Sequence, residues 1–144
     1  MAREERAAWV GLVVSLIAIA VYAAVVAGQA ASTPLAEVDW LGPMLWTIIG
    51  GIVVSIVVTI IWGVVAEGGS LRGENAADER DRAITQMGDR VGVAFLVIGG
   101  VVGIALCAID AAPFWIANTL YAGFALSSVV GGIARVVAYR RGLV

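Results

Sequence analysis

The sequence has no histidine and no lysine, and it contains a single cysteine, Cys107. Without histidine, the chain lacks the side chain that most often binds metals or exchanges protons near neutral pH. One cysteine cannot close an internal disulfide, and we expect Cys107 to be a small packing residue rather than a reactive thiol. The chain also lacks a Cys-x-x-Cys pair, a phosphate-binding glycine loop and a Gly-x-Ser-x-Gly motif. We therefore expect a protein without metal or cofactor that is not an enzyme.

Charge is scarce as well, because charged residues make up 14% of the chain and hydrophobic residues 61%. Soluble domains are only about 45–50% apolar. The apolar residues form four blocks, each close to the ~20 residues that a helix needs to cross ~30 Å of hydrocarbon. These blocks are residues 8–28, 43–66, 91–109 and 114–134.

The blocks predict an all-α integral membrane protein, a single domain of residues 1–144 with four transmembrane helices. Lipid offers the backbone no hydrogen bonds, so a span must be a helix or belong to a closed barrel. The blocks lack the alternating pattern of barrel strands, which leaves helices. The first block is longer than the ~7–15-residue core of a signal peptide, and we expect it to be retained as a span.

The basic residues predict the orientation. They precede the first block, lie between the second and third, or follow the fourth, and the other two connections contain none. Because basic residues stay on the cytoplasmic side, we expect both termini and the connection 67–90 in the cytoplasm. Such a one-sided distribution disfavours insertion in both orientations. The nine arginines are Arg3, Arg6, Arg72, Arg80, Arg82, Arg90, Arg135, Arg140 and Arg141.

The connection 67–90 concentrates much of the charge, in the stretch DERDRAITQMGDRVG that starts at Asp78. Asn75 is a candidate N-cap, and Asp78 and Arg82 are spaced for an i,i+4 pair, so we expect a short cytoplasmic helix from about Ala76. The segment is either a solvated connector that sets the topology or a docking surface for a cytoplasmic protein. Interleaved arginines neutralise its carboxylates and disfavour a cation site. The docking candidates are Asp78, Glu79, Arg80, Asp81 and Arg82.

Small residues recur at every fourth position in the spans, a spacing that lets membrane helices approach closely. Three interpretations are open: packing within one bundle, a seam between two copies, or a solute path lined by hydroxyls. We expect a parallel homo-oligomer with its seam at Gly123, Ser127 and Gly131, while Ser55 and Thr59 are the candidate solute path. The stripes are Gly51, Ser55, Thr59 and Gly63; Gly99, Gly103, Cys107 and Ala111; and Gly123, Ser127 and Gly131.

Two polar residues, one near each end of the last span, invite specific expectations. Asn118 should form a hydrogen bond to another helix or to the turn at Asp110, because an amide in lipid needs a partner. Arg135 of each copy would repel its counterpart across the expected seam. An acidic residue such as Asp78 or Asp81 would then have to offset that repulsion.

The motifs DERDRAI, GDRVG, APFWIANTLYAGFALSSVV and YRRG, between Asp78 and Gly142, resemble a family of small prokaryotic membrane proteins known as domain of unknown function 2178. The resemblance implies a four-helix membrane architecture and supplies no catalytic residues. Members of that family often stand beside small helix-turn-helix regulators, which implies a regulatory protein partner.

These observations lead to two hypotheses about function. The first is a non-enzymatic membrane protein that acts through protein contacts, as an accessory subunit or as a tether for a cytoplasmic regulator, with no direct contact to nucleic acid. The second is a small transporter or channel for an uncharged or lipophilic solute, since the spans carry almost no ionisable group for coupling to ions. An enzyme acting on lipid is disfavoured because no paired carboxylates or activated nucleophile are present.

Overall fold

The computed structural model of the protein describes residues 3–35, 37–66 and 79–141, which are helical apart from two short connections. The helices are α1 (Arg3–Ala30), α2 (Leu41–Ala66), α3 (Glu79–Ala108) and α4 (Pro113–Arg141). All four are long and apolar enough to cross a membrane, which confirms the expected number and type of spans. The architecture fits a multi-pass membrane protein.

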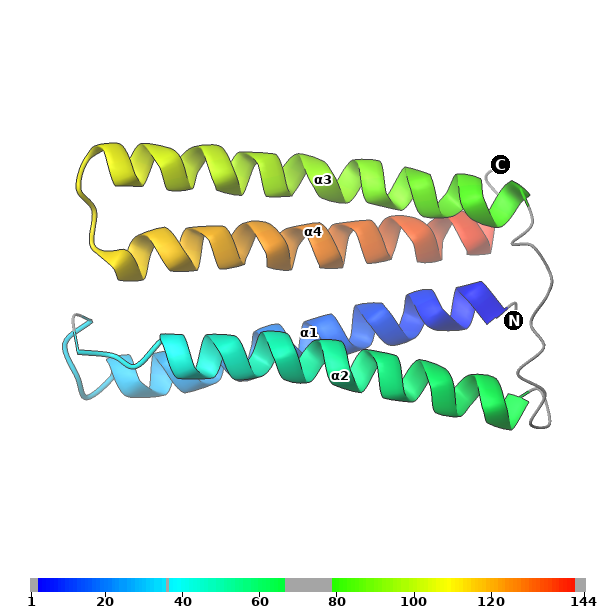
Figure 1. Ribbon diagram of the computed structural model, residues 1–144, viewed down its shortest axis with the longest axis horizontal. Helices are drawn as coiled ribbons and strands as arrows, with labels where there is room; N and C mark the ends of the chain where they lie inside the picture. The colour runs from blue at the N-terminus through cyan, green and yellow to red at the C-terminus, as the bar shows by residue number, and fades with distance from the viewer. Residues whose placement is uncertain (1–2, 36, 67–78, 142–144) are drawn as a thin grey trace.

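The helices run alternately up and down (Figure 1). At one end of the bundle α1 and α3 begin and α2 and α4 finish; we call it the terminal end. At the opposite end, the turn end, short connections join α1 to α2 and α3 to α4. Arg82, Arg90, Arg135 and Arg140 all belong to the terminal half of their helices.

The charged stretch does not form a separate short helix, so that expectation is wrong for the residues described. Residues 79–90 are the first three turns of α3, which continues without interruption to Ala108. The reason is that no proline lies between Glu79 and Ala108, while Gly88 and Gly92 are helical positions buried against α4. Asp78 and the expected start at Ala76 lie outside the described residues.

Side-chain and backbone caps define the turn end. The Asp39 carboxylate Oδ1 accepts a hydrogen bond from the Gly42 backbone N–H at 3.2 Å and so caps the start of α2. After α3, Asp110 adopts a left-handed conformation, with φ of 52°. Its N–H donates to the Cys107 carbonyl, and the Ala111 N–H donates to the Leu106 carbonyl. This is the Schellman pattern, which ends α3 and turns the chain into α4.

The α3–α4 pair forms the closest contact in the bundle, along a seam of small residues. A methyl group added to Gly99 would lie 2.9 Å from the Gly123 Cα, and one added to Gly92 would lie 2.9 Å from the Ser127 carbonyl oxygen. A methyl group on Gly131 would lie 3.0 Å from the Gly88 carbonyl oxygen. The small residues therefore permit a backbone-to-backbone approach that larger side chains would prevent.

The α1 helix packs on α4 with contacts near both ends. Toward the terminal end, Leu12 lies against Gly132, and the Arg140 guanidinium stands 5.3 Å from the ring centroid of Trp9. Toward the turn end, the Tyr22 hydroxyl donates a hydrogen bond to Asn118 Oδ1 at 2.6 Å. The expected cross-helix bond of Asn118 is confirmed.

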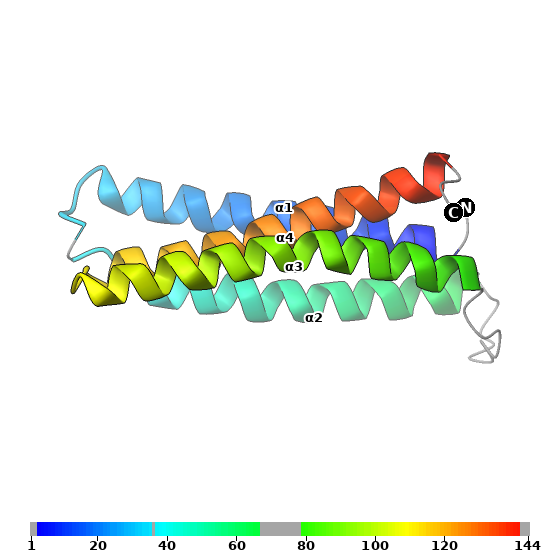
Figure 2. The ribbon, with the colours of Figure 1, turned by 90° about the horizontal axis from the view of Figure 1, so that it is seen from above.

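The α2 helix holds to the bundle mainly through α1, where Gly51 packs against Ala18 and Val14. It has no comparable contact with α3 or α4 among the described residues. In the view from above, α1 and α4 cross (Figure 2). The order of contacts is therefore α2, α1, α4, α3, and the bundle is open between α2 and α4.

Candidate functional site

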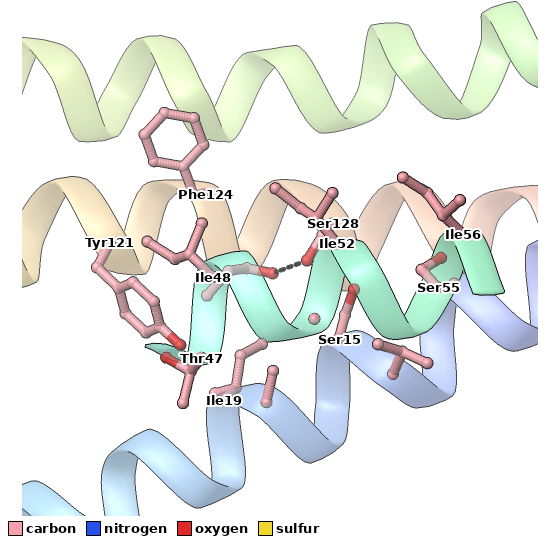
Figure 3. A pocket seen from close by; sticks show the side chains of 15 residues that line it. Ser15, Ile19, Thr47, Ile48, Ile52, Ser55, Ile56, Tyr121, Phe124 and Ser128 are labelled. Atoms are coloured by element: carbon pink, nitrogen blue, oxygen red, sulfur yellow. Dashed lines mark hydrogen bonds between the residues drawn. The ribbon is translucent and has the colours of Figure 1, made fainter. Parts of the chain in front are cut away.

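The opening between α2 and α4 is a groove with a floor formed by α1, and we call it the central groove (Figure 3). Its volume is about 430 Å³, and it is open on one side rather than enclosed. Apolar side chains make up most of its walls, among them Ile48, Ile52 and Ile56 on α2 and Phe124 on α4. The remaining lining residues are Gly11, Val14, Ser15, Ala18, Ile19, Thr47, Gly51, Ser55, Tyr121, Ala125 and Ser128.

The groove is short compared with the helices around it. Its lining on α2 runs from Thr47 to Ile56, and on α4 from Tyr121 to Ser128. At 1.5 Å per residue, these stretches are roughly 10–14 Å long. A membrane core is ~30 Å thick, so the groove occupies less than half of it. A small molecule matches this length better than a transmembrane helix of a partner protein.

Five hydroxyl groups line the groove, and they differ in how they are satisfied. Thr47 donates to the carbonyls of Pro43 and Met44, and Ser128 donates to the Ala125 carbonyl at 3.0 Å. Such bonds to the preceding turn are the usual arrangement for hydroxyls in membrane helices. Ser15, Ser55 and Tyr121 have no hydrogen-bond partner for their hydroxyl groups among the residues that the structure describes.

Aromatic packing positions Tyr121 at the turn end of the groove. Its ring lies 4.4 Å from the ring of Tyr22, centroid to centroid, at an angle of 48°. Tyr22 is anchored by its hydrogen bond to Asn118, and Asn118 Nδ2 donates to the Phe114 carbonyl at 2.8 Å. This chain of contacts fixes the Tyr121 ring while leaving its hydroxyl unpaired.

No charged side chain lines the central groove. The described part of the chain also holds no group of three or more histidine, cysteine, aspartate or glutamate residues that could bind a metal ion. What the groove offers is a largely apolar surface with hydroxyl groups from three helices. It can bind an uncharged molecule through apolar contact and hydrogen bonds.

The structure separates the two residues of the expected solute path. Ser55 lines the groove, but Thr59 does not. Thr59 is exposed and donates its hydroxyl to the Ser55 carbonyl at 2.7 Å. The hydroxyl of Thr59 is therefore satisfied by its own helix, and the two residues do not form one continuous polar path.

The expected subunit seam on α4 is used within one chain. Gly123 and Gly131 are buried against α3, and Ser127 contacts Gly92. A second copy could reach this stripe only by displacing α3. Arg135 is likewise paired inside the chain, because its Nη2 donates to Asp89 Oδ1 at 2.7 Å. Asp89 therefore offsets the charge of Arg135 within the chain, while Asp78 and the side chain of Asp81 lie outside the described residues.

The expected docking residues fall at the edge of the described region. Asp78 lies outside it, and so do the side chains of Glu79, Arg80 and Asp81 in the first turn of α3. Arg82 is exposed. Cys107 is also exposed in the single chain, so it does not pack inside the bundle.

Sequence reasoning missed three of the groove residues, Ser15, Thr47 and Tyr121. One signal for Ser15 was available, because Gly11 and Ser15 have the same four-residue spacing as the stripes in the other spans. No sequence pattern of this kind indicates that Tyr121 lines the groove. Its place in the groove follows from the crossing of α1 and α4, which depends on contacts between residues about a hundred positions apart.

No protein-family model, no curated protein and no solved structure matches the chain. The resemblance to domain of unknown function 2178 thus remains an expectation from the sequence.

Proposed function

We propose that the protein is a non-enzymatic membrane protein that binds an uncharged, lipid-soluble molecule in the central groove. The observation that carries this proposal is the groove itself, about 430 Å³ in volume, with apolar walls and three unpaired hydroxyls. Sites for small molecules typically have ~300–1,000 Å³ and a mostly apolar lining with a few polar groups. Because the groove lies along helices that are apolar enough to span a membrane, its open side would face lipid.

Binding is better supported than a continuous channel. The groove covers roughly 10–14 Å of the helix length, and a path through the membrane would need ~30 Å. Transport would require a second conformation in which the groove opens elsewhere. We place the protein in the cytoplasmic membrane of a prokaryote, as the resemblance to domain of unknown function 2178 implies. The arginine distribution predicts that its terminal end lies inside.

Photolabelling in lipid nanodiscs tests the proposal. The probe is an alkane carrying a diazirine, and labelled peptides are located by mass spectrometry. We expect labels on groove residues of α1, α2 and α4. Ala125→Phe should fill the groove and suppress them, whereas Leu126→Phe, on the exposed face of the same helix, should not. Equal labelling of the two variants would contradict a binding groove.

The second candidate function is contact with a cytoplasmic protein, and the continuity of α3 favours it. Residues 79–90 precede the apolar part of α3 and would extend it by about 18 Å. Arg82, Gln86 and Arg90 are exposed on this extension. A rigid charged helix presents these side chains in a fixed pattern, which a partner can recognise at a lower entropic cost than a flexible loop.

A pulldown from native membranes tests the second candidate. Arg82→Glu should release a specific partner, and Arg141→Glu, an exposed charge on α4 at the same end, should retain it. If both variants capture the same proteins as the unaltered chain, the extension is a solvated connector.

A further inference from the structure

We infer that the ligand of the central groove carries a hydrogen-bond-accepting oxygen, as a ketone or an ester does. Ser15 and Ser55 bind this oxygen, and Tyr121 binds the other end of the molecule. This inference rests on the proposed function, because it names the chemical class of the bound molecule. It follows from which hydroxyls in the groove are satisfied and from where the unsatisfied ones lie.

Some hydroxyl groups in and beside the groove donate a hydrogen bond to their own helix, and others do not. Thr47, Thr59 and Ser128 all donate to carbonyls of the preceding turn. Ser15 and Ser55 are also in the interior of helices, where the same arrangement is available, yet their hydroxyls make no such bond in the described structure. An unpaired hydroxyl in an apolar setting is costly. A ligand with an acceptor oxygen would remove that cost.

The free hydroxyls lie at two positions along the groove. Gly51 packs against Val14 and Ala18, so Ser15 is level with Gly51, and Ser55 follows one turn later. Tyr121 lies toward the turn end, beside Thr47 (Figure 3). Thr47 and Ser55 are separated by about 12 Å along α2. The geometry therefore favours an elongated molecule with its acceptor oxygen between Ser15 and Ser55 and its other end near Tyr121.

The absence of charge in the groove limits the ligand further. A carboxylate, phosphate or ammonium group would find no opposite charge among the lining residues. Leaving such a group uncompensated in the membrane costs several kcal/mol, so charged lipids are disfavoured. Alkanes fit the walls but leave all three hydroxyls unpaired. Uncharged molecules with an acceptor oxygen satisfy both conditions.

The test compares two photoprobes of equal chain length, a ketone and an alkane, each with a diazirine at the same carbon. In nanodiscs, at equal probe-to-lipid ratios, the ketone should label the groove of the unaltered protein about five-fold more strongly than the alkane, the effect of one additional hydrogen bond. Replacing Ser15 and Ser55 with alanine should remove this preference. Ser128→Ala is the matched control, because the Ser128 hydroxyl lines the same groove but is already paired.

The outcomes separate the two proposals. If both probes label the groove equally, and the alanine replacements change neither, the inference about the acceptor oxygen is wrong while the binding groove stands. If neither probe labels the groove, or Ala125→Phe leaves labelling unchanged, both proposals are wrong. Circular dichroism and elution volume in detergent verify that each variant is folded, so a loss of labelling is not mistaken for unfolding.

Discussion

At the scale of single residues, the two stacked tyrosines provide a matched pair. The Tyr22 hydroxyl is bonded to Asn118, whereas the Tyr121 hydroxyl has no partner in the described structure. We expect Tyr22→Phe to lower the free energy of unfolding by about 1 kcal/mol, the usual size of a hydrogen bond between membrane helices. Tyr121→Phe keeps the ring contact with Tyr22 and should lower the free energy of unfolding by less. Titration with dodecyl sulfate in mixed micelles measures both, and equal effects would contradict the bond to Asn118.

Asp110 is the second residue with a distinct expectation, because it holds a left-handed backbone conformation at the α3–α4 turn. An alanine there would have to adopt a conformation that costs L-residues roughly 1–2 kcal/mol. Aspartate and glycine tolerate it better. Asp110→Ala should therefore unfold at lower denaturant than Asp110→Gly, by about 1 kcal/mol. A variant with alanine that is as stable as the one with glycine would show that the turn has rearranged.

Residue-level prediction from the sequence succeeded where the chemistry is local. Asn118 was expected to bond across helices because an amide in lipid must find a partner, and the structure confirms it. The identity of that partner, Tyr22, depends on how α1 crosses α4, and no pattern in the sequence contains that information. Cys107 shows the limit of such reasoning, since it belongs to a small-residue stripe and yet is exposed in the single chain.

At the scale of helices, the α3–α4 seam allows a comparison between neighbouring glycines. A methyl group on Gly99 would meet the backbone of Gly123, whereas one on Gly100 meets nothing within 4 Å. We expect Gly99→Ala to cost about 1–3 kcal/mol, because the helices must separate. Gly100→Ala should be neutral or stabilise by up to about 1 kcal/mol through helix propensity. Thermal unfolding in detergent distinguishes them, and similar midpoints would mean that the two helices are not in backbone contact.

The number of spans was predictable, while the boundaries and partners of the helices were less so. Long apolar blocks are sufficient to identify spans. The charged segment was predicted to form a helix separate from the third span, although nothing in residues 79–90 breaks a helix and α3 continues through them. The small-residue stripes predicted close packing, but spacing alone does not say whether the neighbour is another helix of the chain or a second copy. Gly123 and Gly131 face α3 of the same chain.

At the scale of the whole molecule, the arginine distribution predicts that the terminal end is cytoplasmic. Cys107 is the only cysteine of the protein, so Cys107→Ala gives a cysteine-free variant in which single cysteines can be introduced and labelled. In that background, Ala112→Cys lies in the exposed turn between α3 and α4. It should react with a membrane-impermeant maleimide added to intact cells. Thr85→Cys, exposed near the start of α3, should react only after permeabilisation. The reverse pattern would invert the orientation.

The central groove could not have been predicted from any one span. Its three walls come from α1, α2 and α4, and it exists because α2 packs mainly on α1 and leaves α4 free on one side. Periodicity within a helix identifies which residues share a face. It does not show which faces remain uncovered, because that depends on how the four helices are arranged relative to one another.

The contact between α1 and α4 has a consequence for synthesis of the protein. The ribosome synthesises α1, α2 and α3 before α4. Trp9 and Tyr22 therefore enter the bilayer before their partners on α4, Arg140 and Asn118, have been translated. The nascent chain therefore has no complete groove until Tyr121 to Ser128 have been inserted. A molecule that binds the groove would distinguish finished chains from partial ones, and partial chains would present unpaired polar groups to membrane quality-control proteases.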